Sequence, residues 1–233
     1  MNVLMLVALA CAPGVVIATY IRLKDRYEKE PALLMIKSFF YGVASVVLTL
    51  LISVPLSKII PTGESELTAQ AIHAFLLVAL VEESCKYLVL RWVLFRNDHF
   101  NEPFDGITYS VMVAMGFATA ENIAYVVDGG VEVALIRMFT AVPAHAVFAI
   151  LMGYYLGKAR FGSSPVWSAG LALVVPTLLH GIYDYVLFIN FIPGLWTGGI
   201  LSLIIGIYFS RKAISSHQEA SPFKAVEKLA DKE

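Results

Sequence analysis

The sequence predicts an all-α membrane protein, a polytopic bundle of about seven transmembrane helices. Of its 233 residues, 58% are hydrophobic and only 15% are charged, whereas soluble domains average about 45–50% and about 25%. The apolar residues are gathered in runs of roughly 17–25 residues, the length that an α-helix needs to cross a bilayer. Segments of about ten residues with alternating hydrophobicity do not recur, so a membrane β-barrel is not expected. The same composition excludes a water-soluble domain and a disordered chain.

The apolar runs form one transmembrane domain over residues 1–210, followed by a polar tail over residues 211–233. Short connections with turn-forming residues separate the runs, as at Pro61-Thr62-Gly63 and Asn101-Glu102-Pro103. The tail is rich in Lys and Glu, so we expect it to be solvated. The predicted spans cover about 3–21, 36–56, 71–94, 107–127, 133–156, 166–189 and 195–209.

The basic residues are divided unequally between the two sides of the predicted membrane domain. With seven spans, 14 of the 17 Lys and Arg residues fall on the side of the C-terminus, Lys58 and Arg137 fall on the other, and Lys86 lies within a span. The positive-inside rule therefore places the C-terminus in the cytoplasm and the N-terminus outside. The net charge of −1 gives no basic field that would attract nucleic acid. No nucleic-acid partner is therefore expected, and the apolar spans place the chain in a lipid bilayer.

Seven ionisable side chains lie inside the predicted spans, where each charge costs roughly 2.5–3.5 kcal/mol on insertion scales. Five of them lie roughly 9–17 Å below the outer ends of their helices, at about 1.5 Å per residue. Because four helices bring polar groups to similar depths, we expect a water-filled cavity that opens outward, and such a cluster is more often functional than structural. The seven residues are Glu82, Glu83, Lys86, Glu121, His145, His180 and Asp184.

The spacing of these residues predicts two pairs. Lys86 follows Glu82 by four residues and Glu83 by three, so it can neutralise either carboxylate. Consecutive helical residues point about 100° apart, so one glutamate is expected to act while the other pairs with Lys86. His180 and Asp184 are four residues apart, so Asp184 could orient the imidazole or join it in holding a water or a metal.

The remaining histidines are not expected in this cluster. His73 and His99 lie near predicted membrane edges, and His217 lies in the predicted tail. A lone histidine in such a place is more often hydrogen-bonded within the fold or solvated than catalytic.

Four motifs occur in order along the chain: Glu82-Glu83-Ser84-Cys85-Lys86, Phe117-Ala118-Thr119-Ala120-Glu121-Asn122, His145, and His180-Gly181-Ile182-Tyr183-Asp184. Together they resemble the signature of the PrsW family of intramembrane proteases. The resemblance extends to segments 12–14, 23–31, 104–106 and 155–161, and thus covers nearly the whole chain except the tail.

The resemblance implies a stress-response protease of the bacterial cell membrane. Such an enzyme makes the site-1 cut in a single-span anti-sigma factor, on the extracytoplasmic side, and starts a cascade that frees a sigma factor. The family is similar to CAAX prenyl endopeptidases and bacteriocin-processing membrane proteases, which share paired glutamates and later histidines. This chain has Glu121-Asn122 and Asp184 where those enzymes commonly carry His and Asn, so their residue roles do not transfer directly.

The residues suggest hydrolysis of a peptide bond by an activated water. Glu82 is the expected general base, with Glu83 as the alternative. His145 and His180 would bind or help to activate the water and stabilise the oxyanion. No serine stands with an obvious base at a nucleophile turn, which disfavours a serine protease. The full candidate set is Glu82, Glu83, Glu121, His145, His180 and Asp184, supported by Lys86 and by Asn122 as a further hydrogen-bond donor.

Two forms of water activation stay open. His145, His180 and one of Glu82, Glu83 or Glu121 could supply the three protein ligands of an open zinc site. The sequence has no His-Glu-x-x-His motif, and the ligands would come from separate helices. A metal-free glutamate mechanism is therefore equally compatible with the residues.

Two other classes of protein compete with a protease. Intramembrane carboxylates and histidines also build the proton and ion paths of carriers, although an odd span count and the lack of two related halves argue against one. A membrane scaffold would use the same polar groups only to join its helices.

Overall fold

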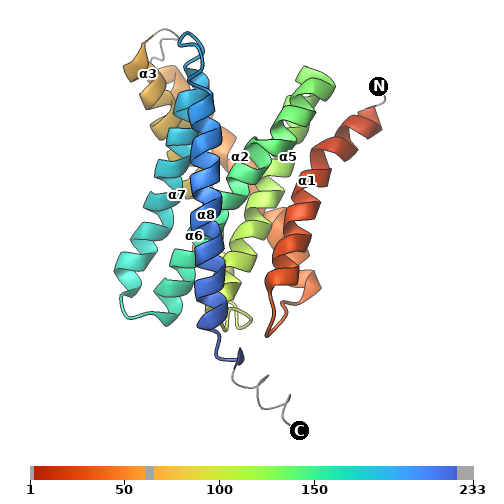
Figure 1. The fold of residues 1–233 in the computed structure, drawn as a ribbon, viewed down its shortest axis with the longest axis vertical. Coiled ribbons are helices and arrows are strands. Elements are labelled where there is room, and N and C mark those ends of the chain that lie inside the picture. The colour runs from red at the N-terminus through yellow and green to blue at the C-terminus, as the bar shows by residue number, and fades with distance from the viewer. Residues whose placement is uncertain (1–2, 61–65, 225–233) are drawn as a thin grey trace.

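The computed structural model describes residues 3–60 and 66–224, and every regular element in these ranges is a helix. The helices run up and down beside one another, and the two chain ends lie at opposite ends of the bundle (Figure 1). The predicted all-α polytopic bundle is therefore confirmed. The helices are α1 (Val3–Lys24), α2 (Ala32–Ile59), α3 (Leu67–Ile72), α4 (Leu80–Val89), α5 (Pro103–Phe139), α6 (Ala141–Phe161), α7 (Pro165–Phe188) and α8 (Thr197–Glu219).

Four helical stretches within the described ranges are long and apolar enough to cross a membrane. These stretches are Leu4–Lys24, Ala32–Ile59, Pro103–Phe161 and Pro165–Phe188. The chain is therefore a multi-pass membrane protein.

The third long helical segment contains two π-helical turns. The π-helical segments His73–Ala79 and Leu90–Leu94 flank α4 and join it to α3 without a break in the helical backbone. Such insertions are frequent at functional sites because they change which residues face a neighbouring helix. Here they lie on either side of Glu82, Glu83 and Lys86.

The last part of α5 departs from the predicted continuous span over 133–156, because that span is broken at Thr140. The chain reverses at Gly130, whose φ of +71° is a conformation that suits glycine. Residues 131–139 then return beside the preceding turns of α5, where Ala134 packs with Val126. A second break follows at Thr140, before α6 begins. The reversal brings the end of α5 back toward the interior of the bundle.

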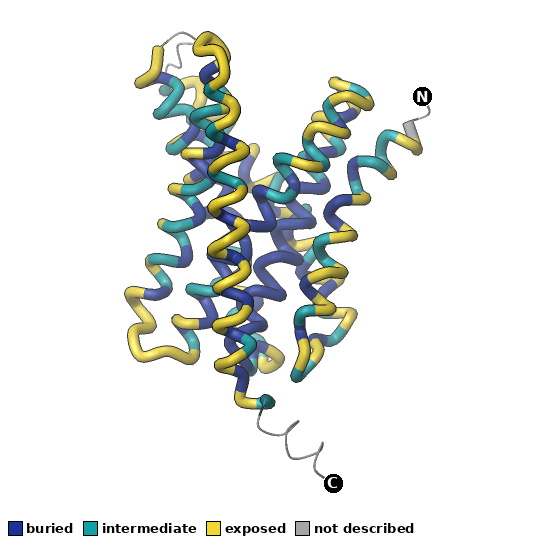
Figure 2. Tube along the Cα trace, viewed as in Figure 1, coloured by how far each residue is buried: buried dark blue, intermediate teal, exposed yellow. Residues whose placement is uncertain are grey.

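Helices α5 and α6 form the buried centre of the protein (Figure 2). They cross so closely that a Cβ on Gly106 would lie 2.3 Å from the carbonyl oxygen of Gly153. Small residues allow this approach, which is the usual way in which helices associate in membranes. The centre is therefore a rigid support on which α4 and α7 pack.

The predicted polar tail begins too early. Helix α8 continues to Glu219, and its residues Ala213, Ile214 and His217 are buried. His217 Nε2 donates a hydrogen bond to the backbone oxygen of Tyr154, at 2.8 Å, on α6. The polar composition hid these contacts because only one stripe of the helix is buried. Residues 225–233, and the predicted Pro61-Thr62-Gly63 turn, lie outside the described residues.

Candidate active site

The two adjacent glutamates of α4 have different surroundings. Glu83 Oε1 lies 2.6 Å from Lys86 Nζ, whereas Glu82 Oε2 lies 3.6 Å from it. Glu83 is 1% exposed and is closed off from the cavity described below, whereas Glu82 lies on the wall of that cavity. Glu82 Oε2 accepts no hydrogen bond. The lysine thus pairs mainly with Glu83, and Glu82 keeps an oxygen available for a ligand or a water.

His180 is held on both sides by carboxylates. Its Nδ1 lies 2.9 Å from Glu83 Oε1, and its Nε2 lies 3.2 Å from Asp184 Oδ2. The ring also stacks on Phe148, with 4.8 Å between ring centroids. Both nitrogens face acceptors, an arrangement that a doubly protonated ring satisfies. The imidazole orientation is therefore fixed by two helices, α4 and α7.

His145 has one acidic and one basic partner. Its Nε2 lies 3.0 Å from Glu121 Oε2, and its Nδ1 lies 3.3 Å from Lys86 Nζ. Because an ammonium group can only donate, Nδ1 accepts and Nε2 carries the proton that is donated to Glu121. The His145 and His180 rings lie edge to face, with 5.3 Å between centroids. The two histidines therefore meet at the centre of the cluster.

Arg137 is the functional candidate that the sequence left out, because it was counted there only as a charge on the outer side. Its Nη2 lies 2.9 Å from Glu121 Oε2, and its Nε donates to Asn122 Oδ1 at 2.9 Å. Asn122 Nδ2 donates in turn to the backbone oxygen of Ala10, at 3.0 Å. Asn122 is thus a buried positioning residue away from the cavity wall, rather than a donor into the cavity. A lone arginine in an otherwise apolar stretch was the available signal.

A cavity of about 450 Å³ connects these side chains. His73, which the sequence placed at a membrane edge outside the site, also lines this cavity and stacks on Phe188 at 5.1 Å between ring centroids. Glu83 and Lys86 lie behind the wall. The structure thus brings together all six catalytic candidates, five of them on the wall. The polar and aromatic lining residues are His73, Glu82, Glu121, Tyr125, Arg137, Thr140, His145, Phe148, His180, Tyr183, Asp184 and Phe188.

Four of these residues have the chemistry of a metal site. Glu82, Glu83, His145 and His180 each offer one ligand atom, and these atoms lie within 4.8 Å of one another. Carboxylate oxygen and imidazole nitrogen are ordinary ligands of zinc, and the bare Glu82 Oε2 adds an unused acceptor. The donor set therefore fits a metal ion. The ammonium of Lys86 contacts three of the same four groups, so a metal ion would compete with it.

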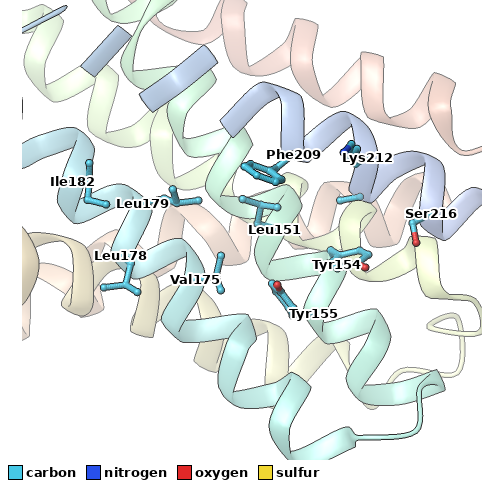
Figure 3. Close-up of a pocket in the computed structure, with 11 residues that line it drawn as sticks. Leu151, Tyr154, Tyr155, Val175, Leu178, Leu179, Ile182, Phe209, Lys212 and Ser216 are labelled. Carbon is cyan, nitrogen blue, oxygen red and sulfur yellow. The ribbon is translucent and has the colours of Figure 1, made fainter. Parts of the chain in front are cut away.

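A second hollow in the protein lacks this chemistry. It has a volume of about 660 Å³ and lies between α6, α7 and α8, where mostly apolar side chains line it (Figure 3). Lys212 and Ser216 lie toward one end, and no Asp, Glu or His is among its lining residues. Without a base or a metal ligand it cannot activate water, so we place the candidate active site in the other cavity.

Comparison with known proteins gives consistent relatives. Residues 30–211 match the family described as "PrsW family intramembrane metalloprotease". The chain is 40% identical over 185 residues to Protease PrsW of Bacillus subtilis, and the aligned region covers 78% of this chain and 82% of the relative. It is 39% identical over 186 residues to Protease PrsW of Geobacillus kaustophilus, with 78% and 79% covered. The corresponding protein of Clostridioides difficile is 38% identical over 191 residues, also with 78% and 79% covered. No solved structure matches the chain.

Proposed function

The chain belongs to the PrsW family of intramembrane metalloproteases and is a membrane-embedded protease, and we propose that it makes the site-1 cut in a single-span membrane anti-sigma factor. The substrate class is supported by the four motifs and their order. The proposed orientation, with the N-terminus outside and the C-terminus in the cytoplasm of a bacterial cell, is supported by the unequal distribution of Lys and Arg.

The observation that carries the mechanism is the carboxylate of Glu82, whose Oε2 lies 3.6 Å from Lys86 Nζ but forms no hydrogen bond. This oxygen is buried and belongs to a residue on the wall of a cavity that both histidines also line. A carboxylate in this state can take a proton from a water beside it. We therefore assign the general base to Glu82 and a positioning role to Glu83, whose oxygen already contacts Lys86 and His180.

The reaction is a hydrolysis in which the proton passes through Glu82. The water oxygen forms a bond to the peptide carbonyl carbon as Glu82 takes a water proton. The charge that develops on the carbonyl oxygen is stabilised by Arg137, which has N–H groups beyond those bonded to Glu121 and Asn122, and by the nearby positive charge of the doubly protonated His180 ring. The carbon–nitrogen bond then breaks, and Glu82 returns the proton to the leaving amine. Asp184 keeps the His180 ring in place throughout.

A metal ion has a defined place in this scheme. His145, His180 and one of Glu82 or Glu83 would hold it, with His180 giving up one of its two ring protons. When bound, a zinc-type ion polarises the carbonyl and makes its water more acidic. Metal analysis of the purified protein, together with cleavage measured in the presence of a chelator, distinguishes this form from the metal-free one.

The test is cleavage of tagged single-span anti-sigma factors co-expressed with the enzyme. We expect truncation with the wild type and with the exposed control Glu132→Gln. With Glu82→Gln the rate falls by about 10²–10⁴-fold, since a general base is lost, while protein abundance stays the same.

Persistent cleavage by Glu82→Gln at wild-type abundance would refute the assignment. If that variant instead loses proton or ion flux in liposomes and the wild type cleaves none of the substrates, the protein acts as a carrier.

A further inference from the structure

A second cluster of acidic residues lies at the opposite end of the bundle from the N-terminus, at the lower end in Figure 1, where α1 ends and α2 and α5 begin. Two of the segments that carry the family resemblance, 23–31 and 104–106, contribute to it, yet neither reaches the candidate active site. The cluster has five members, and all of them except Glu28 are almost fully buried, with exposed fractions of 0–2%. The members are Asp25, Glu28, Glu30, Glu102 and Asp105.

Hydrogen bonds hold one oxygen of Asp105 and one oxygen of Glu30 in place. Asp105 Oδ2 accepts from the backbone nitrogens of Asn101 and Glu102, both at 2.7 Å, and so caps the start of α5. Glu30 Oε2 accepts from the hydroxyl group of Tyr109. These bonds are made by the backbone and by a tyrosine, so they orient the carboxylates without neutralising them.

The other oxygens of the cluster lack a donor partner, although a hydrogen bond can link the carboxyl groups of Glu30 and Asp105 when one of them is protonated. Glu28 Oε2, Glu30 Oε1 and Asp105 Oδ1 are buried and accept no hydrogen bond, and the same is true of Asp25 Oδ1 and Glu102 Oε2. Among the described residues, no Lys, Arg or His nitrogen forms an ion pair with any of these five side chains within 4.0 Å. Buried carboxylates without a counter-charge are costly, so a positive charge at this place would stabilise the fold.

The cost of burying these carboxylates without a counter-charge also raises the pKa of the members that lie outside the helices. Burial and the neighbouring Glu102 raise the pKa of Asp25 to about 7. Burial likewise raises the pKa of Glu30 and that of Glu102.

We propose that Glu28, Glu30 and Asp105 form a binding site for a hard divalent cation of the Ca²⁺ or Mg²⁺ class. One oxygen of each residue lies within 4.8 Å of the others, which is inside the roughly 5 Å that separates opposite oxygen ligands of Ca²⁺. All the donors are oxygens, which suits Ca²⁺ and Mg²⁺ rather than zinc. Asn101, whose backbone nitrogen donates to Asp105, also has a buried side-chain oxygen without a hydrogen bond.

The site joins parts of the chain that are far apart in sequence. Glu28 and Glu30 belong to the connection between α1 and α2, and Asp105 belongs to the first turn of α5. A cation there ties the first two helices to the central one. Glu28 is half-buried rather than closed off, so it lies on the side from which an ion can enter.

The test measures cation binding to the full-length protein in detergent after removal of metals. Radioactive Ca²⁺ is used in equilibrium dialysis, with Mg²⁺ as competitor, so that the two cations are distinguished. We expect one cation per chain for the wild type. Glu30→Gln and Asp105→Asn weaken binding at least tenfold, while Asp128→Asn, an exposed aspartate of the same helix, binds as the wild type does.

Both variants keep an oxygen where the fold needs one, since Asn is a good helix cap and Gln can still accept from Tyr109. The proposal fails if the wild type binds neither cation at about 1 mM, the weak end of protein calcium sites. It also fails if Asp105→Asn binds normally while Glu82→Gln does not, since the cation would then lie in the active site. Because no step depends on proteolysis, failure of the proposed enzyme function leaves this measurement unaffected.

Discussion

Helix α5 carries two carboxylates, the buried Asp105 near its start and the half-buried Glu121 about 24 Å further along, and they belong to clusters of opposite character. In the active-site cluster, the carboxylates have basic partners within 4.0 Å: Glu83 with Lys86, Glu121 with Arg137 and Asp184 with His180. The second cluster, Asp25, Glu28, Glu30, Glu102 and Asp105, is called here the lower cluster. None of its five carboxylates has such a partner among the described residues. The first cluster offsets most of its negative charge within the chain, whereas the second needs protons or a cation from outside.

Removal of the central lysine should produce the largest change in stability. Lys86→Met leaves Glu83 buried without its closest counter-charge, which typically costs about 3–5 kcal/mol. We expect a corresponding fall in the free energy of unfolding, measured by denaturation in detergent. If a metal ion can replace the ammonium, added zinc restores part of the loss; Lys158→Met, on the same side of the bundle as the lower cluster, should show no zinc effect. An unchanged stability would show that the charges of the active-site cluster are not coupled as described.

The pH dependence of stability should reveal the unbalanced cluster. Asp25 faces Glu28, Glu30 and Glu102, and its pKa is raised from an ordinary value near 3.8 to about 7. The folded protein therefore binds more protons than the unfolded chain between these values, so stability decreases as pH rises through this window. The decrease is at most about 3 kcal/mol between pH 5 and 7. Thermal melting of metal-stripped protein tests it, and Asp25→Asn should flatten the slope.

Arg137→Gln should have a smaller effect on stability and a clear one on activity. Its partly buried ion pair with Glu121 lies between exposed and fully buried pairs, so we expect a loss of about 1–2 kcal/mol. If Arg137 stabilises the oxyanion, kcat falls more than KM changes. A change in KM alone would leave it a substrate-binding or structural residue.

Asp105→Asn should have the smallest effect, and in the opposite direction. In metal-stripped protein at pH 8 the substitution removes one acidic group from an unbalanced cluster and keeps a side-chain oxygen that accepts from the backbone at the start of α5. We expect a gain in unfolding free energy of less than about 1 kcal/mol, whereas Glu83→Gln, which removes a balanced charge, should destabilise the protein. A loss of several kcal/mol in Asp105→Asn would indicate an undetected counter-charge at the lower cluster.

Much of the fold could be predicted because apolar runs of bilayer length have few alternatives to a helix. The exceptions are local. The reversal at Gly130 falls in the predicted connection between the spans 107–127 and 133–156, but the second break at Thr140 was missed because it lies inside an apolar run. The extension of α8 to Glu219 was missed because its few buried residues, Ala213, Ile214 and His217, are interspersed with exposed polar residues.

For the candidate site, too, the sequence predicted the general arrangement but not the individual contacts. The depth and helical spacing of Glu82, His145 and His180 are enough to place these residues at one level of the membrane. The sequence could not choose between Glu82 and Glu83, because adjacent residues have the same depth. It also could not connect Arg137 with Glu121, whose contact depends on the chain reversal between them.

The residue order alone determines that this chain enters a membrane as helices and carries acids and imidazoles into it, because the energetic demands of the bilayer act on each segment separately. Which carboxylate meets a base, and which remains without one, was decided only when the helices packed. Those pairings depend on distances of a few ångströms between segments up to about a hundred residues apart, as between Glu83 and His180, and local sequence does not encode such distances.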